Sequence, residues 1–220
     1  LAQTLAGSAA VALENAKLYS TARQHAEQMR VVNQIGRDIS GILDVEALLV
    51  QVGRRLEMAF GYYHANLGLI GAAEVMFPAR FDERRQIMLP ELRLALSGPG
   101  LVAWVARQSR ARYVGDVHAD PDYLPDPLLP ATVSEAVVPL VAPDRTLGVL
   151  DIQSDQPHQW GPEAAATLEA IGGQVAVAID NARLFAEARQ RAAEVSALLA
   201  TTLAVTSTME LDARLQAIAE

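Results

Sequence analysis

The sequence predicts an α+β fold in which long helices flank a β-rich centre. All 11 prolines lie between Pro78 and Pro162. Proline breaks the interior of a helix at a cost of ~3 kcal/mol, so both ends of the chain are free to form long helices. Hydrophobic residues make up 51% of the chain and aromatic residues 5%, which is typical of a helix-rich globular protein with a sizeable core. The proline-containing centre holds β-rich runs around turns.

The elements of this centre follow from local patterns. We expect strands at 65–70 and 74–81 around a turn at 71–73, a helix at 100–108, a strand at 112–114, and strands at 135–141 and 147–154 around a turn at 142–145. The last two strands are expected to pair as an antiparallel hairpin. Residues 115–132 are rich in proline and aspartate and too irregular for a regular element, and long loops of this kind often carry function.

Two segments of the chain resemble each other at an offset of 166 residues. Val11–Tyr19 and Val177–Phe185 are identical or similar at every position, including Asn15 with Asn181 and Tyr19 with Phe185. Two alanine-rich helices that are alike only in composition would not match at these positions. The repeat therefore predicts whole domains in tandem. A helix pattern already runs at Leu1, so we expect this chain to be a piece of a longer protein.

Apolar residues spaced by three and four positions predict a dimer seam along both terminal helices. A helix from Glu163 to Thr206 would be roughly 60 Å long, so beyond Phe185 its apolar stripe outruns a compact domain and needs a partner. A parallel homodimer supplies one. For Ile171–Ile179 the stripe is equally explained by packing on the helix's own domain. The predicted seam comprises Ala182, Phe185, Ala188, Ala192, Val195 and Leu199, with Ala16, Tyr19, Ala22, Ala26 and Met29 in the first copy.

Charge and composition exclude several classes of function. The 18 lysines and arginines against 26 acidic residues give a net charge of -8, which repels nucleic acid. The absence of cysteine excludes disulfides, thiolate metal sites, iron–sulfur clusters and cysteine nucleophiles. The longest apolar runs are far shorter than the ~20 residues of a membrane helix, and no targeting signal opens the chain. We therefore expect a soluble, cytoplasmic protein without membrane insertion.

Five segments in order resemble the GAF domains of bacterial multi-sensor signalling proteins such as histidine kinases of two-component systems. They are GLVAWVAR at 100–107, YVGDVHADP at 113–121, SEAVVPL at 134–140, LGVLDIQS at 147–154 and VAVAIDNARLF at 175–185. The resemblance implies an antiparallel sheet of about six strands, with the terminal helices packed on one face and extended as coiled-coil-like linkers. It divides the chain into a linker helix at 1–40, a GAF domain at 41–185, a linker helix at 186–206 and the start of a following GAF-like repeat at 207–220.

The resemblance also implies a small-molecule pocket on the other face, roofed by the short helix and the long loop. Covalent bilin binding and methionine sulfoxide reduction use cysteines in this family, and this chain has none. The Phe81-Asp82-Glu83 run does not occupy the place of the family's cyclic-nucleotide signature. Trp104 equally suits a core position and Asp116 a turn. The candidate ligand-binding residues are Trp104, Tyr113, Asp116, Asp122, Tyr123 and Glu135.

The sequence offers no catalytic constellation, no metal set and no evident cofactor. Of the four histidines, only His118 has acidic neighbours, and it lies in a loop where solvation is the simpler explanation. Two functions remain open. The chain is either a sensory module that relays a signal through dimeric helices to adjacent GAF and output domains, or a structural spacer and dimerisation domain that binds nothing.

Overall fold

The computed structural model describes residues 30, 32–34, 36–39, 41–78 and 80–219, with the side chains of 197 and 199–219 excepted. Most of the first predicted linker, including Ala16, Tyr19, Ala22, Ala26 and Met29 of the predicted seam, lies outside these residues. The elements are α2 (Val45–Phe60), β1 (His64–Ile70), β2 (Glu74–Phe77), β3 (Arg80–Asp82), β4 (Ile87–Leu89), β5 (Leu92–Ala95), α3 (Leu101–Gln108), β6 (Arg112–Val114), the 3₁₀ helix η1 (Val117–Ala119), β7 (Ser134–Val141), β8 (Thr146–Ser154) and α4 (Pro162–Ala219).

The strands form the predicted six-stranded antiparallel sheet, in the order β5-β2-β1-β8-β7-β6. Both predicted hairpin turns are confirmed. The amide of Gly71 donates to the carbonyl of Glu74 at 2.8 Å, and the amide of Ala142 donates to the carbonyl of Arg145 at 2.8 Å. Strands β3 and β4 form a separate two-stranded sheet.

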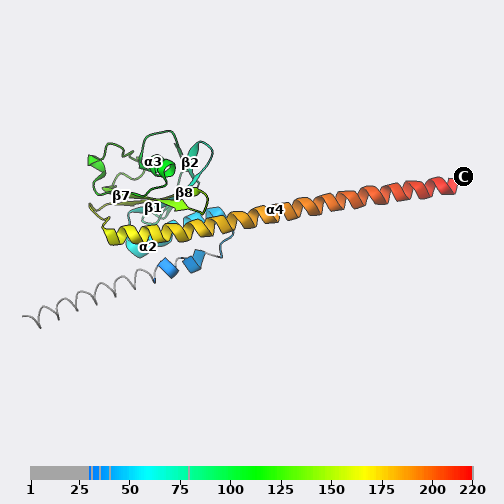
Figure 1. Cartoon of the computed structure of the whole chain (residues 1–220), viewed down its shortest axis with the longest axis horizontal. Helices are drawn as coiled ribbons and strands as arrows, with labels where there is room; N and C mark the ends of the chain where they lie inside the picture. Colours follow the sequence, from blue (N-terminus) through cyan, green and yellow to red (C-terminus); the bar gives the residue numbers. More distant parts are fainter. Residues whose placement is uncertain (1–29, 31, 35, 40, 79, 220) are drawn as a thin grey trace, which may run out of the picture.

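The two faces of the sheet carry different layers (Figure 1). Helices α2 and α4 pack on one face, whereas α3 lies on the other. Side chains alternate between faces along a strand. Ala136, Val138 and Leu140 of β7 therefore face the core beneath α2 and α4, and Val137 faces the core beneath α3. Strand β7 therefore contacts the core beneath α3 with one face and the core beneath α4 with the other.

Helix α2 has clear start and stop signals. Asp44 is its N-cap, and its carboxylate accepts a hydrogen bond from the amide of Ala47 at 2.8 Å. Gly61 follows the helix in the left-handed conformation, with φ of 69°, where glycine is favoured. The buried side of α2 includes Leu48, Val52 and Leu56. This helix is consistent with the proline-free first part of the chain, although the sequence patterns did not delimit it.

Helix α4 is the longest element, with 58 residues, and projects far from the body (Figure 1). It was predicted to end near Thr206 but continues to Ala219, because no proline or glycine follows Gly173 to end it. The first part of its apolar stripe, which includes Ile171 and Val175, packs on the sheet. Within the described residues, no helix is both long and apolar enough to span a lipid bilayer.

The predicted dimer seam needs one correction. Ala182 is fully buried against its own domain and is not available to a partner helix. Farther along α4, Phe185, Ala188, Ala192 and Val195 are exposed, and Leu184 and Leu198 add to the exposed apolar surface. The side chain of Leu199 lies outside the described residues. The part of the seam that α4 leaves open to a partner therefore begins at Phe185.

The region between β2 and α3 departs most from the predicted elements. The single strand predicted at 74–81 is two strands, because β2 ends at Phe77 before Pro78, and β3 begins at Arg80 in a different sheet. Strands β4 and β5 were not predicted. They are three and four residues long and are separated by Pro90 and Glu91, which leaves little periodicity to detect.

We expect Gly53→Ala to destabilise the domain by about 1–3 kcal/mol, because α2 packs closely on β1. A Cβ at Gly53 would lie 2.5 Å from the backbone oxygen of Ala65. Gly173→Ala is the matched control, since a Cβ there meets nothing within 4 Å, and it should stabilise helix α4 by about 0.4–1 kcal/mol. Urea unfolding followed by circular dichroism measures both changes. Equal stabilisation by the two substitutions would contradict the close packing of α2 on β1.

Candidate functional site

A cavity of about 110 Å³ lies between the sheet and the roof formed by α3 and the loop at 115–133. Its polar floor comes from Glu135 of β7 with Asp151 and Gln153 of β8. At another part of the wall stand Arg80 of β3 and Asp126 of the loop. The apolar lining consists of Phe77, Leu92, Leu94, Leu101, Val102 and Leu124, with two loop prolines.

Strand pairing explains why polar side chains gather beneath this roof. Glu135 lies opposite Gln153, and Gln153 lies opposite His64 on β1. Two residues along, Asp151 lies opposite Asn66. Residues at these positions share one face of the sheet. All five side chains are buried, so the roof side of three central strands carries a polar patch where a core would normally be apolar.

Glu135 and Asp151 form a buried carboxyl pair. Burial raises the pKa of Glu135 well above its ordinary value of 4.5, and the Asp151 carboxyl raises it further. Burial also raises the pKa of Asp151, although a hydrogen bond from Gln153 opposes the shift. Two adjacent carboxyls in a low dielectric do not both ionise readily.

Hydrogen bonds orient the floor of the cavity. The hydroxyl of Thr132 donates to Oε1 of Gln153 at 2.6 Å, which leaves the Gln153 amide to donate to Oδ2 of Asp151 at 3.3 Å. When both carboxyls are ionised, Oδ1 of Asp151 has no hydrogen-bond donor within the described part of the chain. A proton shared with Glu135, or a donor on a ligand, would satisfy this oxygen.

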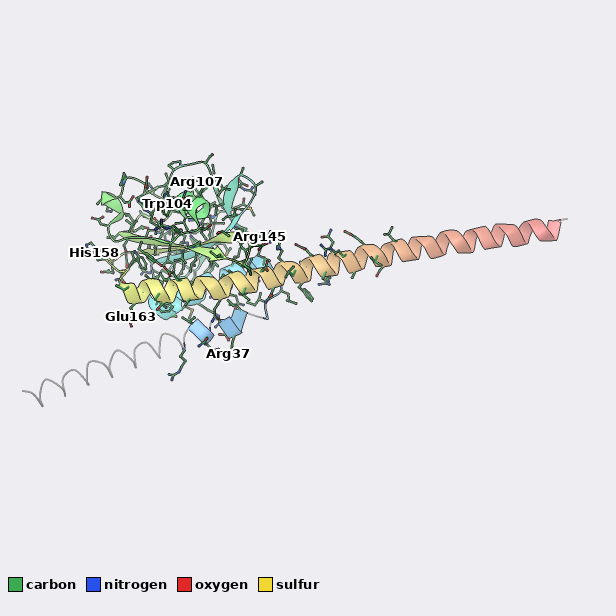
Figure 2. All side chains as sticks on the ribbon, in the orientation of Figure 1. Arg37, Trp104, Arg107, Arg145, His158 and Glu163 are labelled. Atoms are coloured by element: carbon green, nitrogen blue, oxygen red, sulfur yellow. The ribbon has the colours of Figure 1, made fainter. Side chains whose placement is uncertain are left out.

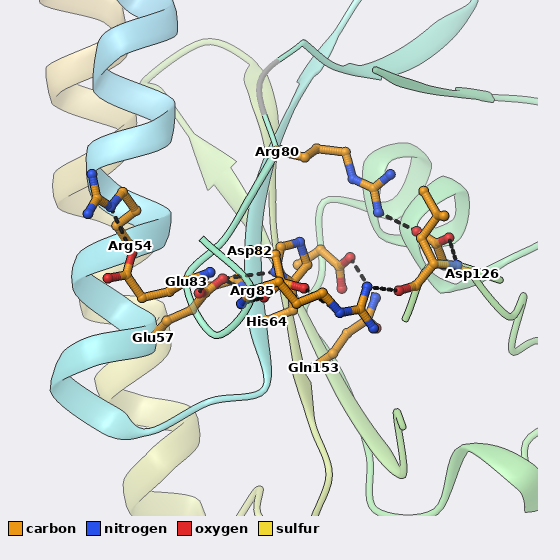
Figure 3. A network of polar contacts seen from close by, with 12 residues as sticks. Arg54, Glu57, His64, Arg80, Asp82, Glu83, Arg85, Asp126 and Gln153 are labelled. Atoms are coloured by element: carbon orange, nitrogen blue, oxygen red, sulfur yellow. Dashed lines mark hydrogen bonds and ion pairs between the residues drawn. The ribbon is translucent and has the colours of Figure 1, made fainter. Parts of the chain in front are cut away.

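Arg80 is a buried cation in the wall of the cavity, with only 2% of its side chain exposed. Its Nη2 group pairs with the Asp126 carboxylate, and Nη1 donates to the carbonyl of Pro90 at 3.4 Å. Its Nε is buried and has no hydrogen-bond partner among the residues that the structure describes. Figure 3 shows Arg80 extending from β3 toward Asp126.

A second arginine fastens the loop to the roof. Arg112 of β6 contacts Asp120 at 3.0 Å and Asp122 at 2.7 Å, and its guanidinium lies 5.5 Å from the ring centroid of Trp104. These contacts join β6, α3 and the loop. Arg112 therefore holds the roof in place, and its side chain is occupied by protein groups.

Another polar network fixes α2 to the neighbouring strands (Figure 3). The buried Glu57 carboxylate accepts hydrogen bonds from the amides of Ala65 at 2.9 Å and Glu83 at 3.0 Å. Nδ1 of His64 lies 2.9 Å from Oε1 of Glu57. Arg54 pairs with Glu83 at 2.8 Å. This network is structural, because its groups serve backbone amides and one another.

Of the six predicted ligand-binding residues, Glu135 lines the cavity directly. Trp104 packs in the roof core, on the side of the sheet away from α4 (Figure 2), and Tyr123 packs against the same core. Burial, followed by the Glu135 charge, raises the pKa of Tyr123, so its ring lies near the carboxyl pair. The Asp122 carboxylate accepts a hydrogen bond from Arg112 and does not line the cavity.

Two of the predicted residues have structural roles. Asp116 caps η1 by accepting a hydrogen bond from the amide of His118 at 3.0 Å. Tyr113 lies on the opposite face of the sheet from the cavity, because Arg112 and Val114 take the roof side of β6. Its hydroxyl donates to Glu169 of α4 at 3.0 Å. Tyr113 therefore belongs to the helix side and not to the pocket.

Four polar residues that line the cavity were missed by sequence reasoning: Arg80, Asp126, Asp151 and Gln153. Asp151 and Gln153 were quoted only as part of a family segment, yet their alternation with the apolar Leu150 and Ile152 places both on one face of β8. That period-two pattern, together with Glu135 on the partner strand, was a usable signal. Arg80 begins a new strand after β2 ends before Pro78, and no local sequence pattern identified it as a cavity residue.

A family model for the GAF domain matches residues 42–180, which is more than half of the chain. The chain belongs to the GAF domain family. No curated protein matches this GAF chain at significant similarity. Among the described residues, no group of three or more histidine, aspartate or glutamate side chains is arranged to hold a metal ion.

Solved structures share the GAF fold at low sequence identity. The GAF domain of a phosphoenolpyruvate-protein phosphotransferase from Coxiella burnetii is 22% identical over 74% of this chain and 98% of its own, with a TM-score of 0.64. A free methionine-R-sulfoxide reductase from Neisseria meningitidis, in complex with its substrate, is 24% identical over 73% of this chain and 93% of its own, with a TM-score of 0.60. A GAF sensor protein from Burkholderia vietnamiensis is 23% identical over 69% and 93%, with a TM-score of 0.57.

Proposed function

We propose that this GAF domain is the sensory module of a signalling protein, and that a small molecule binds in the cavity beneath α3. The observation that carries the proposal is the buried carboxyl pair of Glu135 and Asp151 on the cavity floor. Burying ionisable groups costs stability, and such groups gather at functional sites. Ligand binding would offset this cost.

The alternative function is a structural spacer and dimerisation domain that binds nothing. A spacer is expected to fill the space beneath its roof with its own apolar side chains. The cavity of about 110 Å³ and its ionisable lining favour a ligand-binding module instead.

We propose that this module acts without catalysis of its own. The Neisseria neighbour is a reductase of free methionine sulfoxide, and the family resemblance assigns that chemistry to cysteines. This chain contains no cysteine. The structure of that neighbour in complex with its substrate nonetheless supports the proposal that a protein of this fold binds a small molecule. A histidine kinase of a two-component system is the parent protein that we propose.

The relay that we propose passes from β7 to α4. Strand β7 presents Glu135 to the cavity and Val138 to the opposite face, where Val138 lies 3.1 Å from the Cβ position of Gly172 on α4. A ligand that shifts β7 would therefore change the packing of α4 directly. Such a relay requires two arrangements of α4 that the ligand binds with different affinity.

We further propose that α4 pairs with α4 of a second copy and carries the signal to an output domain. Phe185, Val195 and Leu198 are 47%, 56% and 69% exposed on the projecting part of the helix. Among the described residues this length of helix packs on no other element, so a partner helix is the simplest cover for its apolar side chains.

A thermal-shift screen of the chain tests the ligand-binding proposal. Cyclic nucleotides, haem, amino acids and small organic acids are the compounds to compare. A ligand that binds only the folded state adds about 2.7 kcal/mol to the free energy of unfolding at a concentration of 100 Kd, and so raises the midpoint of thermal unfolding. We expect at least one small metabolite to raise it in proportion to concentration. A screen with no response would support the spacer function.

A further inference from the structure

A larger cavity lies on the helix side of the sheet, between the first turn of α2, the end of β1, the start of β8 and helix α4. It measures about 420 Å³, against about 110 Å³ for the cavity beneath α3. Pockets that hold drug-sized ligands occupy about 300–1,000 Å³. We call this cavity the neck groove. Its lining includes Val45, Leu69, Met76, Leu147, Ile179 and Arg183.

The floor and walls of the neck groove are mainly apolar. Leu69 of β1 lies opposite Met76 of β2, so both side chains share the face of the sheet that α2 and α4 cover. Leu147 and Val45 pack against the same core, and Ile179 adjoins it from α4. All of these side chains except Ile179 are only partly buried. A ligand with an aliphatic chain would therefore be stabilised by removing their apolar surface from water.

Two arginines line the groove near the point where α4 leaves the body (Figure 2). Nη2 of Arg183 lies 3.5 Å from Oδ1 of Asp180, and Nη1 lies 3.5 Å from Oε1 of Glu187. Nη2 of Arg145 lies 3.8 Å from the same oxygen of Asp180. Close charge-assisted hydrogen bonds measure about 2.7–2.9 Å, so these pairs are loose. Nε of Arg183 is buried and has no hydrogen-bond partner among the residues that the structure describes.

A carboxylate suits these donors. A guanidinium presents Nε and one Nη group as a fork that matches the two oxygens of a carboxylate. Nearby acids limit the ligand to a single negative charge, because Asp180 and Glu187 already face the arginines and Glu46 of α2 lines the groove. A phosphate monoester carries more negative charge and would meet stronger repulsion.

We propose that the neck groove binds a medium-chain aliphatic carboxylate, whose tail covers the apolar lining and whose head group binds Arg183 and Arg145. This site goes beyond the proposed sensory function, because it is built from other residues than the cavity beneath α3 and lies on the other face of the sheet. One competing explanation is that the arginines only form surface ion pairs along α4. Another is that a second chain covers the groove.

Isothermal titration of the whole chain with butyrate, hexanoate and octanoate tests the tail. Each methylene removed from water should tighten binding by up to about four-fold, so we expect about ten-fold for each two carbons added. A constant affinity along this series would overturn the apolar groove.

Three probes with the same tail test the head group. Octan-1-ol and octylammonium should each bind at least ten-fold more weakly than octanoate, and octyl phosphate should also bind more weakly. Equal binding of octanoate and octan-1-ol would overturn the role of the arginines. Tighter binding of octyl phosphate would overturn the choice of a carboxylate.

Arg183→Gln should weaken octanoate by at least ten-fold and leave octan-1-ol within about three-fold of its original affinity. Arg191→Gln is the matched control, because Arg191 also lies on α4 and approaches Glu187 at 3.7 Å but does not line the groove. It should leave octanoate binding unchanged. Equal weakening by both substitutions would show that octanoate responds only to the overall charge of α4, which would overturn the site.

Methyl NMR of the original chain locates the ligand. Octanoate should shift the methyl signals of Leu147 and Ile179 and leave those of Leu101 and Val102 beneath α3 unchanged. Shifts at Leu101 and Val102 alone would overturn the neck groove and leave the proposed sensory function intact. No binding of octanoate would also overturn the neck groove, and is the result expected if a second chain covers it.

Discussion

Glu135→Gln is expected to raise the free energy of unfolding at pH 8 by about 1–2 kcal/mol. The substitution keeps the size of the side chain and removes a carboxyl whose ionisation is costly in this position. For a chain of this size the midpoint of thermal unfolding should rise by about 2–4 °C per kcal/mol. Differential scanning calorimetry measures the change.

The pH dependence gives this prediction its sign. Burial and Asp151 raise the pKa of Glu135 in the folded chain above its ordinary value of 4.5. At a pH between the ordinary pKa and the folded-state pKa, the folded chain therefore binds a proton that the unfolded chain has lost. Stability from this group is therefore full below about pH 4.5 and is lost as the pH rises through the folded-state pKa. The gain from Glu135→Gln should be present at pH 8 and vanish near pH 4.

An exposed carboxyl provides the control. Glu91→Gln removes a surface charge that pairs with Arg93, and surface pairs contribute about 0–1 kcal/mol. It should not raise stability at either pH. A loss of stability in Glu135→Gln that is equal at pH 4 and pH 8 would show that Glu135 serves as a structural hydrogen-bonding group.

Val195→Glu is expected to convert a dimer of this chain into a monomer at micromolar concentration. Val195 is 56% exposed on α4, far from the domain body, and belongs to the predicted seam. Two glutamates buried face to face in a dimer would cost about 2–4 kcal/mol, which weakens association by about 30- to 1,000-fold. Light scattering coupled to size-exclusion chromatography measures the mass.

Gln190→Glu is the matched control for this change. Gln190 is exposed on the same helix, two residues from both Ala188 and Ala192, and so lies away from the seam. It should leave the mass unchanged. A monomeric original chain, or equal dissociation by both substitutions, would refute pairing through the seam.

The sheet was predictable where its strands are long and paired locally. The runs that became β7 and β8 are eight and nine residues long, with a turn between them, so local pattern and tertiary contact agree. Strands β3, β4 and β5 have three or four residues each, and their pairing depends on the path of the chain around Pro78 and Pro90. Sequence periodicity carries little information at that length.

The candidate site was predictable only in part, for a related reason. Glu135 and Tyr113 were both predicted from the resemblance to the family; Glu135 lines the cavity, whereas Tyr113 lies on the other face of the sheet. The face that a side chain occupies follows from strand register, and a shift of one residue reverses it. Arg80 pairs across the cavity wall with Asp126, 46 positions away in the chain, and no local pattern reveals such a contact.

The unbroken course of α4 makes the domain resemble a short body on a long lever. The part beyond Ala186 extends to Ala219, about 50 Å at a rise of ~1.5 Å per residue. A tilt of about 5° where the helix leaves the sheet would move its far tip by about 4 Å over that length. Rearrangements at the sheet too small to alter the fold would thus become displacements at the tip comparable to one helical turn.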